Sequence, residues 1–449
     1  MHTVKTRKQR CIVVGGGVAG IAAAVEATLQ GMEVVLIEAR RYLGGRARSF
    51  RDDTSGDVLD NGQHVAMGCY AALRYVLRQL GTEHLLGPDD PVPIVFASAG
   101  NERDRFDPYR LPGAAGVIAG VLRLRSFSLA ERLRLLQRGV LAAFGPRPEG
   151  KTVAALLERW KQPQTVIERF WEPLVLATLN APIESADATL LRAVLRRAFF
   201  GGGKSHYLLV PRVGLSELWE PLPAWLAGRG GQVQLGLQAV ELLRVGDRVI
   251  GVATDDGEEI RGNAVIAAVP PKALLRLLGP ESDAARAAAA FETMPIVSVY
   301  LWYDRPLDIP PVVGLWGTTS QWVFDRDRLI ERSDDSRRQF PGHVEVTISA
   351  ARHVATQPAE TIAALADREL RAVFPSVEPA QLLRWRVIKE RAATVLLTPK
   401  TISLRLTPHG SIAGLFVAGD WTATGLPATL ESAAASGIAA ARAAARLHR

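Results

Sequence analysis

Apolar runs and helical patterns alternate over the N-terminal part of the chain. A short run, Cys11–Val14, is followed by glycines and an Ala-rich stretch, and then by a second apolar run, Val34–Ile37. This order predicts a buried strand, a tight turn, a helix and a second strand, which is the unit from which parallel sheets are built. Residues 67–204 are predicted to be mostly helical, with a stretch rich in Pro and Gly at 108–120.

The strand pattern returns after residue 204. Residues 291–400 alternate apolar and polar runs, such as Val297–Trp302, and predict an antiparallel sheet with a helix near 359–373. The other expected elements are strands at Gln232–Leu235, Val249–Thr254, Val265–Val269 and Leu415–Ala418, and an Ala-rich helix at about 429–446. No window holds the roughly 18 uncharged apolar residues of a membrane-spanning helix.

These patterns predict an α/β fold with an α+β substrate region. A chain of 449 residues is too long to fold around a single simple core, so we expect more than one domain. A Rossmann-like nucleotide-binding domain is expected to be discontinuous, formed by residues 1–70, 205–285 and 405–449. Residues 71–204 would form a helical region that faces the substrate and the membrane, and residues 286–404 a substrate domain built on an antiparallel sheet.

The chain is basic, with 54 Lys and Arg against 46 Asp and Glu and a net charge of +8. This bias favours anionic surfaces, but no nucleic-acid-binding motif accompanies it, so we expect no nucleic acid partner. Two cysteines, Cys11 and Cys69, are too few for a disulfide framework or a zinc site and suit a reducing compartment. We expect no metal site, and we expect Cys69 to be a small buried residue.

The N-terminal segment resembles a signal peptide, because four basic residues between Lys5 and Arg10 precede an apolar run. The same run forms the first predicted strand, and the glycine turn lies inside what would be the apolar core of the signal. We therefore interpret this segment as part of the fold.

The turn after the first strand holds three glycines, Gly15, Gly17 and Gly20, with Ala19 between the last two. Gly15 permits the tight turn, Gly17 lets the backbone approach a pyrophosphate, and Gly20 lets the helix pack on the sheet. The free N–H groups of the helix N-terminus suit the phosphate charge. Glu38, 18 residues after Gly20, ends the second strand and can accept a hydrogen bond from a ribose hydroxyl. Together these residues predict a dinucleotide site.

Two further segments suit a flavin dinucleotide. The backbone of Gly45 can approach a cofactor, and Arg46 can neutralise a phosphate or reach a ring carbonyl. Near the C-terminus a strand ends in a Gly-Asp pair, whose carboxylate can accept from ribityl hydroxyls, and the next helix can stabilise negative charge at the flavin N1–C2=O edge. The residues assigned to the cofactor there are Gly419, Asp420, Thr429 and Leu430.

The two ends of the chain resemble the flavoprotein group that contains the amine oxidases and the phytoene desaturases. In that group an N-terminal Rossmann unit, a mid-chain strand and a C-terminal Gly-Asp pair together hold FAD, so FAD is the implied cofactor. By the same resemblance, Val240 would contact the adenine through its backbone.

A closer resemblance, over essentially the whole chain, is to the hydroxysqualene dehydroxylase family. It rests most strongly on Gly62-Gln63-His64 and on the Gly-Leu-Pro-Ala-Thr segment that ends at Thr429. Supporting segments are Leu59–His64, Trp171–Leu174, Leu179–Pro182, Phe199–Gly202, Leu209–Arg212 and Gln321–Arg326. Gly214 and Ser432 depart from the expected pattern, which has an acid and a Gly there, so packing at these two positions is expected to differ.

The resemblance implies reductive removal of the hydroxyl group of hydroxysqualene, which gives squalene for hopanoid synthesis. Since hydroxide is a poor leaving group, an acid should protonate it, and the allylic cation then takes a hydride from N5 of the reduced flavin. His64 is the expected acid, because the segment of Gly62 and Gln63 should run beside the flavin ring and histidine titrates near neutrality. The alternative is a histidine that bonds a backbone carbonyl and only shapes the pocket.

Asp60 is expected to orient His64 or to stabilise the turn. Glu172 and Asp325 are lower-ranked candidates for the acid, and each also suits a surface or helix-capping role. No second dinucleotide turn accompanies the first one. Reduction of the flavin then requires a separate electron donor or a slow direct reaction, and the sequence leaves both open.

Residues 110–147 hold seven Arg, one Glu and neither Lys nor Asp. A capping box is expected at Ser128–Glu131, and the apolar positions that follow with helical spacing are Leu129, Leu133, Leu136 and Val140. Basic residues beside an apolar face predict peripheral contact with anionic lipid. The family resemblance implies a bacterial enzyme, so the expected location is the cytoplasmic face of the inner membrane. The alternative is an amphipathic helix packed on its own domain.

Three other functions share parts of this pattern. An oxidative desaturase of carotenoid type would use the same cofactor with the opposite electron flow, and the two segments that favour the dehydroxylases argue against it. An amine oxidase would need a paired aromatic cage, which we cannot place. A non-catalytic carrier of prenyl lipids is disfavoured because all the residues assigned to the flavin are present.

Overall fold

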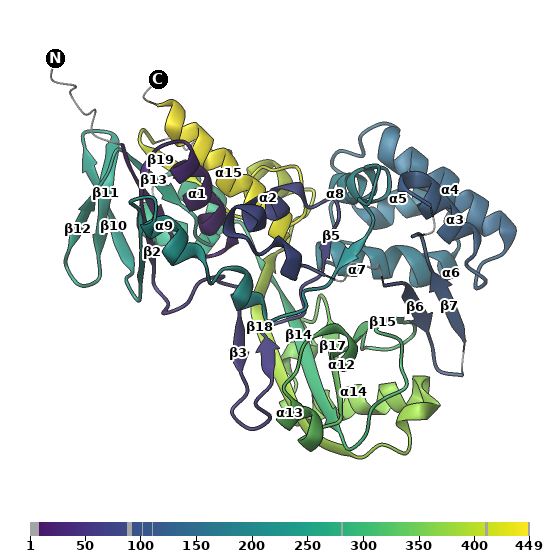
Figure 1. Ribbon diagram of the computed structural model, residues 1–449. Coiled ribbons are helices and arrows are strands. Elements are labelled where there is room, and N and C mark those ends of the chain that lie inside the picture. The colour runs from purple at the N-terminus through teal and green to yellow at the C-terminus, as the bar shows by residue number, and fades with distance from the viewer. Residues whose placement is uncertain are drawn as a thin grey trace.

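The computed structural model (Figure 1) describes residues 9–87, 92–100, 102–109, 111–279, 282–408 and 412–447. A parallel sheet with its covering helices lies at one end, and a helical region lies at the other (Figure 1). A larger sheet, mostly antiparallel, lies below and between them. This arrangement agrees with the predicted α/β fold with an α+β substrate region.

The parallel sheet is assembled from three distant parts of the chain. Its strand order is β19-β13-β1-β2-β9, and all neighbouring strands are parallel. The strands are β1 (Arg10–Val14), β2 (Glu33–Glu38), β9 (Gln232–Leu235), β13 (Ala264–Ala267) and β19 (Leu415–Val417). In β1, β13 and β19 every residue or nearly every residue is buried, because both faces of the sheet are covered.

Two helices cover one face of this sheet, α1 (Val18–Leu29) and α15 (Leu430–Arg446). They pack at short range, since a Cβ added to Gly437 of α15 would lie 2.1 Å from the carbonyl oxygen of Ala19. Glu26 is buried beneath them and accepts hydrogen bonds from Arg442 (2.8 Å) and from the Tyr75 hydroxyl (3.0 Å). The first and last parts of the nucleotide-binding unit are therefore joined directly.

The other face of the parallel sheet is covered by an antiparallel sheet and by short helices. That sheet has the order β10-β11-β12, and it buries Leu242, Val249 and Val252. The elements of this region are β10 (Ala239–Val245), β11 (Arg248–Thr254), β12 (Glu259–Arg261), α10 (Pro271–Leu278) and α11 (Asp283–Ala289). Helix α9 (Leu222–Ala227) precedes β9.

The larger sheet has the order β18-β14-β17-β16-β15-β6-β7, and its neighbours are antiparallel except for β15 and β6. Its strands are β6 (Ile94–Ala97), β7 (Arg103–Phe106), β14 (Thr293–Tyr303), β15 (Val312–Leu315), β16 (Trp322–Asp325), β17 (Gly342–Ile348) and β18 (Leu382–Val395). Helix α14 (Ala359–Val373) covers one face through Ile362, Ala366 and Leu370. The short helices α12 (Arg326–Leu329) and α13 (Asp334–Gln339) lie between β16 and β17.

The helical region carries the elements between β7 and β8. Its helices are α3 (Gly113–Leu122), α4 (Leu129–Phe144), α5 (Val153–Arg159), α6 (Gln164–Val166), α7 (Glu172–Leu179) and α8 (Ala188–Val194). The expected capping box at the start of α4 is present, with the Ser128 side chain accepting from the Glu131 N–H and the Glu131 carboxylate accepting from the Ser128 N–H. None of the helices in the described ranges is long and apolar enough to cross a membrane.

Short paired segments connect these parts. The hairpin of β3 (Ser49–Arg51) and β4 (Val58–Asp60) reaches down onto the larger sheet, and β5 (Ala66–Met67) pairs with β8 (Leu208–Leu209). Helix α2 (Ala71–Leu80) lies beside α15. The strands β6 and β7 lie within residues 71–204, which we predicted to be mostly helical. The short apolar run of β6 gains strand structure from a distant partner, β15, and β7 then pairs with β6, which explains the difference.

Candidate functional site

A cavity of about 970 Å³ lies where the parallel sheet meets α7, β14 and β18. It opens at the carboxyl ends of β1, β2, β13 and β19, which is where ligands bind in parallel sheets. The predicted residues that line it are Gly15, Gly17, Ala19, Glu38, Gly45, Arg46, Gly62, Gln63, His64, Val240, Gly419, Asp420, Thr429 and Leu430. The fold thus brings together residues that are up to four hundred positions apart.

Gly20 and Asp60 lie outside the lining of this cavity. Gly20 packs behind the turn, where an added Cβ would lie 1.8 Å from the carbonyl oxygen of Gly15. Gly15 itself has φ +104°, and a Cβ there would lie 2.5 Å from the Ala268 oxygen. Both glycines are required by the close approach of backbone to backbone.

Gly17 differs from its two neighbours, because an added Cβ would meet nothing within 4 Å. Its backbone has an ordinary φ of −74° and caps the N-terminus of α1. The space in front of it is open to the cavity and faces free N–H groups of the helix, an arrangement that suits a pyrophosphate. The cradle therefore fits the phosphates of a dinucleotide.

Glu38 is held at the end of β2 by two backbone hydrogen bonds. Oε2 accepts from Gly16 (2.6 Å), and Oε1 accepts from Arg40 (2.8 Å). Each carboxylate oxygen can accept a further hydrogen bond, so the group remains able to receive ribose hydroxyls. Val240 of β10 lines the same end of the cavity.

Arg46 and Asp420 meet on the opposite wall, where Nη2 of Arg46 lies 2.7 Å from Oδ1 of Asp420. Nη1 of the same arginine donates to the carbonyl of Ala393 in β18 (2.8 Å). The Gly419 N–H donates to Ser436 of α15 (2.8 Å), which fixes the turn after β19. Arg46, predicted to bind a phosphate or a ring carbonyl, and Asp420, predicted to bind the ribityl chain, are therefore adjacent and joined by an ion pair.

His64 lies half-buried in the cavity wall, and its Nδ1 is 2.7 Å from the carbonyl oxygen of Gly62. Because a carbonyl only accepts, Nδ1 must carry the hydrogen. Burial lowers the pKa of His64, and the nearby Arg46 lowers it further, against the opposing effects of Gly62, Asp60 and Glu390. The neutral ring therefore has Nε2 as an acceptor, for which the described residues offer no partner.

Asp60 lies behind His64 in a buried polar cluster. Its Oδ1 accepts from the Ser49 hydroxyl (2.6 Å) and from the Leu215 N–H (3.1 Å), and its Oδ2 lies 3.6 Å from Arg326. These contacts hold Asp60 at the end of β4, the strand that leads to His64. No hydrogen bond joins the two side chains in the part of the chain that the structure describes.

The same cluster holds the backbone of Gln63. Buried Glu345 of β17 accepts from the Gln63 N–H (2.9 Å) and from Arg326 (3.1 Å), and Arg326 also donates to the Gln63 side chain (3.2 Å). Burial raises the pKa of Glu345 to about 7, although the positive charge of Arg326 opposes this shift. This cluster, which sequence analysis missed, fixes the segment that carries His64.

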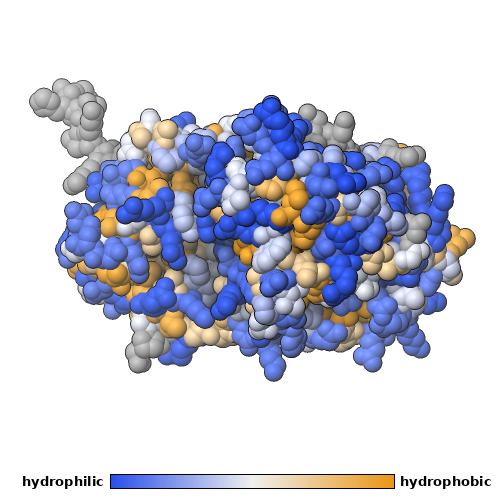
Figure 2. All heavy atoms as spheres, turned by 90° about the horizontal axis from the view of Figure 1, so that it is seen from below, coloured by the Kyte–Doolittle hydropathy of each residue, from blue (hydrophilic) through white to orange (hydrophobic). Residues whose placement is uncertain are grey.

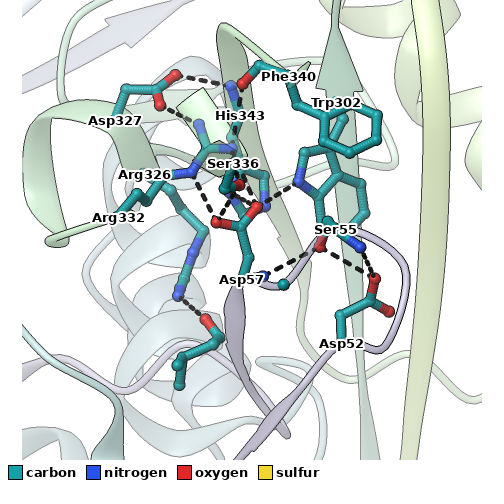
Figure 3. Close-up of polar contacts among 12 residues, drawn as sticks. Asp52, Ser55, Asp57, Trp302, Arg326, Asp327, Arg332, Ser336, Phe340 and His343 are labelled. Carbon is teal, nitrogen blue, oxygen red and sulfur yellow. Dashed lines mark hydrogen bonds and ion pairs between the residues drawn. The ribbon is translucent and has the colours of Figure 1, made fainter. Parts of the chain in front are cut away.

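A second buried cluster anchors the β3–β4 hairpin to the larger sheet (Figure 3). The Asp57 carboxylate accepts from the Trp302 indole (2.7 Å), from the Ser336 hydroxyl (2.6 Å) and from two nitrogens of Arg332 (2.9 and 3.0 Å). Arg332 also pairs with Asp327. Because the Asp57 carboxylate accepts four hydrogen bonds from three side chains, the hairpin that positions Asp60 is held firmly.

Sequence analysis also missed Asn180 and Glu390. Asn180 ends α7 in a left-handed conformation, donates to Thr394 (2.9 Å) and accepts from the Ala350 N–H (2.7 Å). Glu390 projects from β18 into the cavity. The Asn within the segment Leu179–Pro182 was visible in the sequence, whereas nothing marked Glu390 among the other charged residues of its strand.

The two lower-ranked acids lie outside the cavity lining. Asp325 caps α12 by accepting from the Asp327 N–H (3.1 Å), and Glu172 lies in the first turn of α7. Local contacts also explain the residues at the two positions that depart from the family pattern, Gly214 and Ser432. A side chain at Gly214 would lie 2.6 Å from Val58, and Ser432 uses its hydroxyl to donate to the Asp420 carbonyl (3.1 Å).

Around Leu176 and Leu179 of α7, the cavity wall is mainly apolar, with Ile296 of β14 and Val65 nearby. A wall of this kind suits an apolar ligand. Arg46, His64 and Glu390 are among the ionisable side chains that line the same cavity.

Comparison with known proteins shows which family the chain matches. The family described as flavin containing amine oxidoreductase matches residues 18–445. Hydroxysqualene dehydroxylase from Rhodopseudomonas palustris is 33% identical over 440 residues, and that from Sinorhizobium fredii is 31% identical over 448 residues, each covering 96% of both chains. Among solved structures, a triple mutant of putrescine oxidase has a TM-score of 0.75 at 19% identity, covers 98% of this chain and 99% of its own, and shares the fold.

The phytoene desaturases are more distant. A 15-cis-phytoene desaturase from Capsicum annuum is 23% identical over 470 residues, which cover 96% of this chain and 77% of the desaturase. The sequence identity therefore favours the dehydroxylases.

Proposed function

The chain belongs to the flavin-containing amine oxidoreductase family, and we propose that within it the protein removes the hydroxyl group of hydroxysqualene to give squalene. The observation that carries this proposal is the full-length similarity to hydroxysqualene dehydroxylases at up to 33% identity, against 23% for a phytoene desaturase. The apolar wall of the cavity supports a long isoprenoid substrate.

FAD is the cofactor, and the residues that line the cavity fit it. We propose that Gly17 and the start of α1 hold the pyrophosphate, that Glu38 holds the adenosine ribose and that Asp420 holds the ribityl chain. The remaining assigned contacts are made by Ala19, Gly45, Arg46, Val240, Thr429 and Leu430. When bound and reduced, the flavin supplies the hydride that replaces the hydroxyl group.

The chain's own residues provide the rest of the chemistry. Leu176, Leu179 and Ile296 surround the isoprenoid chain and exclude water from the reacting carbon. His64 meets the substrate hydroxyl through Nε2, and Asp60 positions His64 through the strand and turn between them. Protonation of the hydroxyl oxygen then lets it leave as water.

We also propose that α3 and α4 lie on a membrane surface. The side chains of Leu129, Leu133 and Val140 are 62%, 54% and 47% exposed, and the buried residues of α4 are instead Leu135, Ala142 and Ala143. Three of the four apolar positions noted in the sequence thus face outward, whereas the fourth, Leu136, packs against the core. Seen from below, apolar side chains protrude at the end of the molecule where Figure 1 places these helices (Figure 2).

Arginines flank this apolar surface at positions 123, 125, 132, 134 and 138. Basic side chains beside exposed leucines favour an interface with anionic lipid. The proposed location is the cytoplasmic face of a bacterial inner membrane, where the substrate dissolves. We further propose that a separate electron donor reduces the flavin.

Anaerobic single turnover tests the proposed function. The purified holoenzyme is photoreduced, hydroxysqualene is added in detergent, flavin absorbance is followed, and the lipid is extracted. Reoxidation of the flavin with formation of squalene is expected. If the reduced enzyme does not react, and phytoene instead bleaches the oxidised enzyme, the protein is a desaturase. A purified protein without flavin absorbance would point to a lipid carrier.

A further inference from the structure

Glu390 lies at a bulge in β18, on the wall of the cavity. Ile296 of β14 pairs with Glu390, whereas Met294 pairs with Thr394, so four steps along β18 match two along β14. A bulge bends its strand and redirects the side chains beside it, and bulges are frequent next to active sites. Here the bulge directs the carbonyl of Ala393 to Arg46, while Glu390 lines the cavity.

Three carboxylates line the cavity, and only one of them is weakly held. Glu38 accepts two short backbone hydrogen bonds, and Asp420 forms an ion pair with Arg46. Glu390 accepts only two long hydrogen bonds, from the Asn61 amide (3.4 Å) and from the Ala392 N–H (3.3 Å). No cation lies within ion-pair distance of Glu390 among the residues that the structure describes.

His64 and Glu390 line the same cavity, and the charge of Glu390 raises the pKa of His64, although burial is the largest effect and lowers it. The other charged groups on the cavity side are Arg46, which also senses Glu390, and Asp420 beside it. The neighbours of Glu390 on its own strand turn elsewhere. Lys389 donates to the Gln357 carbonyl, and Arg391 is exposed.

We propose that Glu390 donates the proton to the leaving hydroxyl of the substrate, while neutral His64 accepts the hydrogen bond of that hydroxyl through Nε2. This assignment rests on the proposed dehydroxylation. The O–H bond of the Glu390 carboxyl group breaks, and its proton forms a bond to the hydroxyl oxygen. The C–O bond breaks with both electrons going to oxygen, water leaves, the carbon takes the hydride of the reduced flavin, and the carboxylate regains a proton from solvent.

Two physical reasons favour this division of roles. The hydrogen on Nδ1 of His64 is committed to the Gly62 carbonyl, so the neutral ring has no proton to donate into the cavity. When an apolar chain displaces water around Glu390, loss of solvation favours the neutral carboxyl group, because no cation among the described residues forms an ion pair with it. The acid is therefore formed in response to the substrate.

The proposal is tested with Glu390→Gln, Glu390→Asp and His64→Gln holoenzymes, and with Glu292→Gln as the control at an exposed surface carboxylate. Single-turnover reoxidation of the photoreduced enzymes by hydroxysqualene is measured against pH. Glu390→Gln should be slower by about 10²–10⁴-fold and should lose the wild-type pH profile, since a carboxamide cannot donate the proton. Glu390→Asp should recover part of the rate.

His64→Gln should mainly raise KM, because an amide oxygen still accepts a hydrogen bond. A second readout does not depend on turnover. The infrared difference spectrum of the oxidised holoenzyme with and without hydroxysqualene should show a protonated carboxyl band that shifts in D₂O and is missing from Glu390→Gln. Flavin content and thermal stability of each variant verify that the cofactor site and the fold are intact.

Two results overturn the assignment. One is a Glu390→Gln enzyme that keeps the wild-type rate and pH profile while the wild type forms squalene, and the other is a carboxyl band that persists in this variant. If the wild type forms no squalene, the proposed function itself fails. Squalene formation by the wild type therefore distinguishes a failure of the Glu390 assignment from a failure of the proposed function.

Discussion

The carboxylate of Glu431 caps helix α2 by accepting a hydrogen bond from the backbone N–H of Leu73 (3.0 Å). The neighbouring N–H of Ala72 donates to the same carboxylate (3.1 Å). Tyr70 at the N-cap of α2 provides no side-chain cap, so a residue from the first turn of α15 satisfies the free donors. The helix predicted to meet the flavin is thereby tied to α2.

Replacing Glu431 by Ala should lower the free energy of unfolding by about 1–2 kcal/mol, as the loss of a helix cap does elsewhere. Glu431→Gln should cost less, because its amide oxygen still accepts one of the two hydrogen bonds. Urea unfolding followed by circular dichroism measures both. Exposed Glu220 provides the control, and equal stability of Glu431→Ala and Glu220→Ala would contradict the capping role.

Gly17→Val should remove FAD while leaving the fold intact. The added side chain enters open cavity space at a residue with ordinary φ, so it displaces a ligand and not protein atoms. Flavin absorbance of the purified variant and its melting temperature as apoprotein measure the two effects. Gly20→Ala is the matched contrast, since its methyl group collides with the Gly15 carbonyl and should destabilise the apoprotein itself. Normal flavin content in Gly17→Val would refute the assignment of Gly17.

The buried Glu345 should make stability fall as pH rises. Its pKa is about 7 in the folded protein, against an ordinary value of 4.5 in the unfolded chain. Between these values the folded state binds more protons, so this group's contribution is fully present below about pH 4.5 and is lost through about pH 7, at no more than about 1.4 kcal/mol per pH unit.

Urea unfolding of the wild type and Glu345→Gln at several pH values between 5 and 8 measures this effect. As pH rises, the free energy of unfolding of the wild type should fall relative to that of Glu345→Gln. Exposed Glu378→Gln serves as the control. Parallel curves for wild type and Glu345→Gln would show that Glu345 has no raised pKa.

The double variant Leu133→Glu, Val140→Glu should bind vesicles at least about tenfold more weakly, a change of about 1.4 kcal/mol. Both side chains are exposed on α4, and burial of their apolar surface in lipid would be replaced by burial of charge. Flotation with vesicles that contain anionic phospholipid measures binding, and added salt should weaken it. Val245→Glu, at an exposed apolar residue of β10, is the control. Flotation that is insensitive to anionic lipid and to the double variant would exclude this surface.

The sequence was most informative where local rules decide the structure. The glycines of the first turn, the buried strands beside them and the capping box of α4 each require particular residues at fixed spacing, and all were predicted. Helix α14 was predicted with the bounds that it has, because its apolar positions repeat over four turns.

The parts that were missed depend on contacts between distant segments. Glu345 and Arg326 come from β17 and α12, and they meet Gln63 only because the β3–β4 hairpin lies on the larger sheet. Glu390 reaches the cavity because of a bulge that no local pattern marks. The outward orientation of Leu133 was likewise undetermined, since helical spacing gives a face but not what covers it.

The pairing of Glu26 with Arg442 joins residues 416 positions apart and has a consequence for biosynthesis. Helix α1 is therefore synthesised long before α15, the helix that covers it. Until α15 and β19 have been made, the apolar side of α1 and the edge that β19 will occupy remain uncovered, and such a surface is prone to aggregation. The cavity, which Leu430 of α15 also lines, is complete only once that helix has been made.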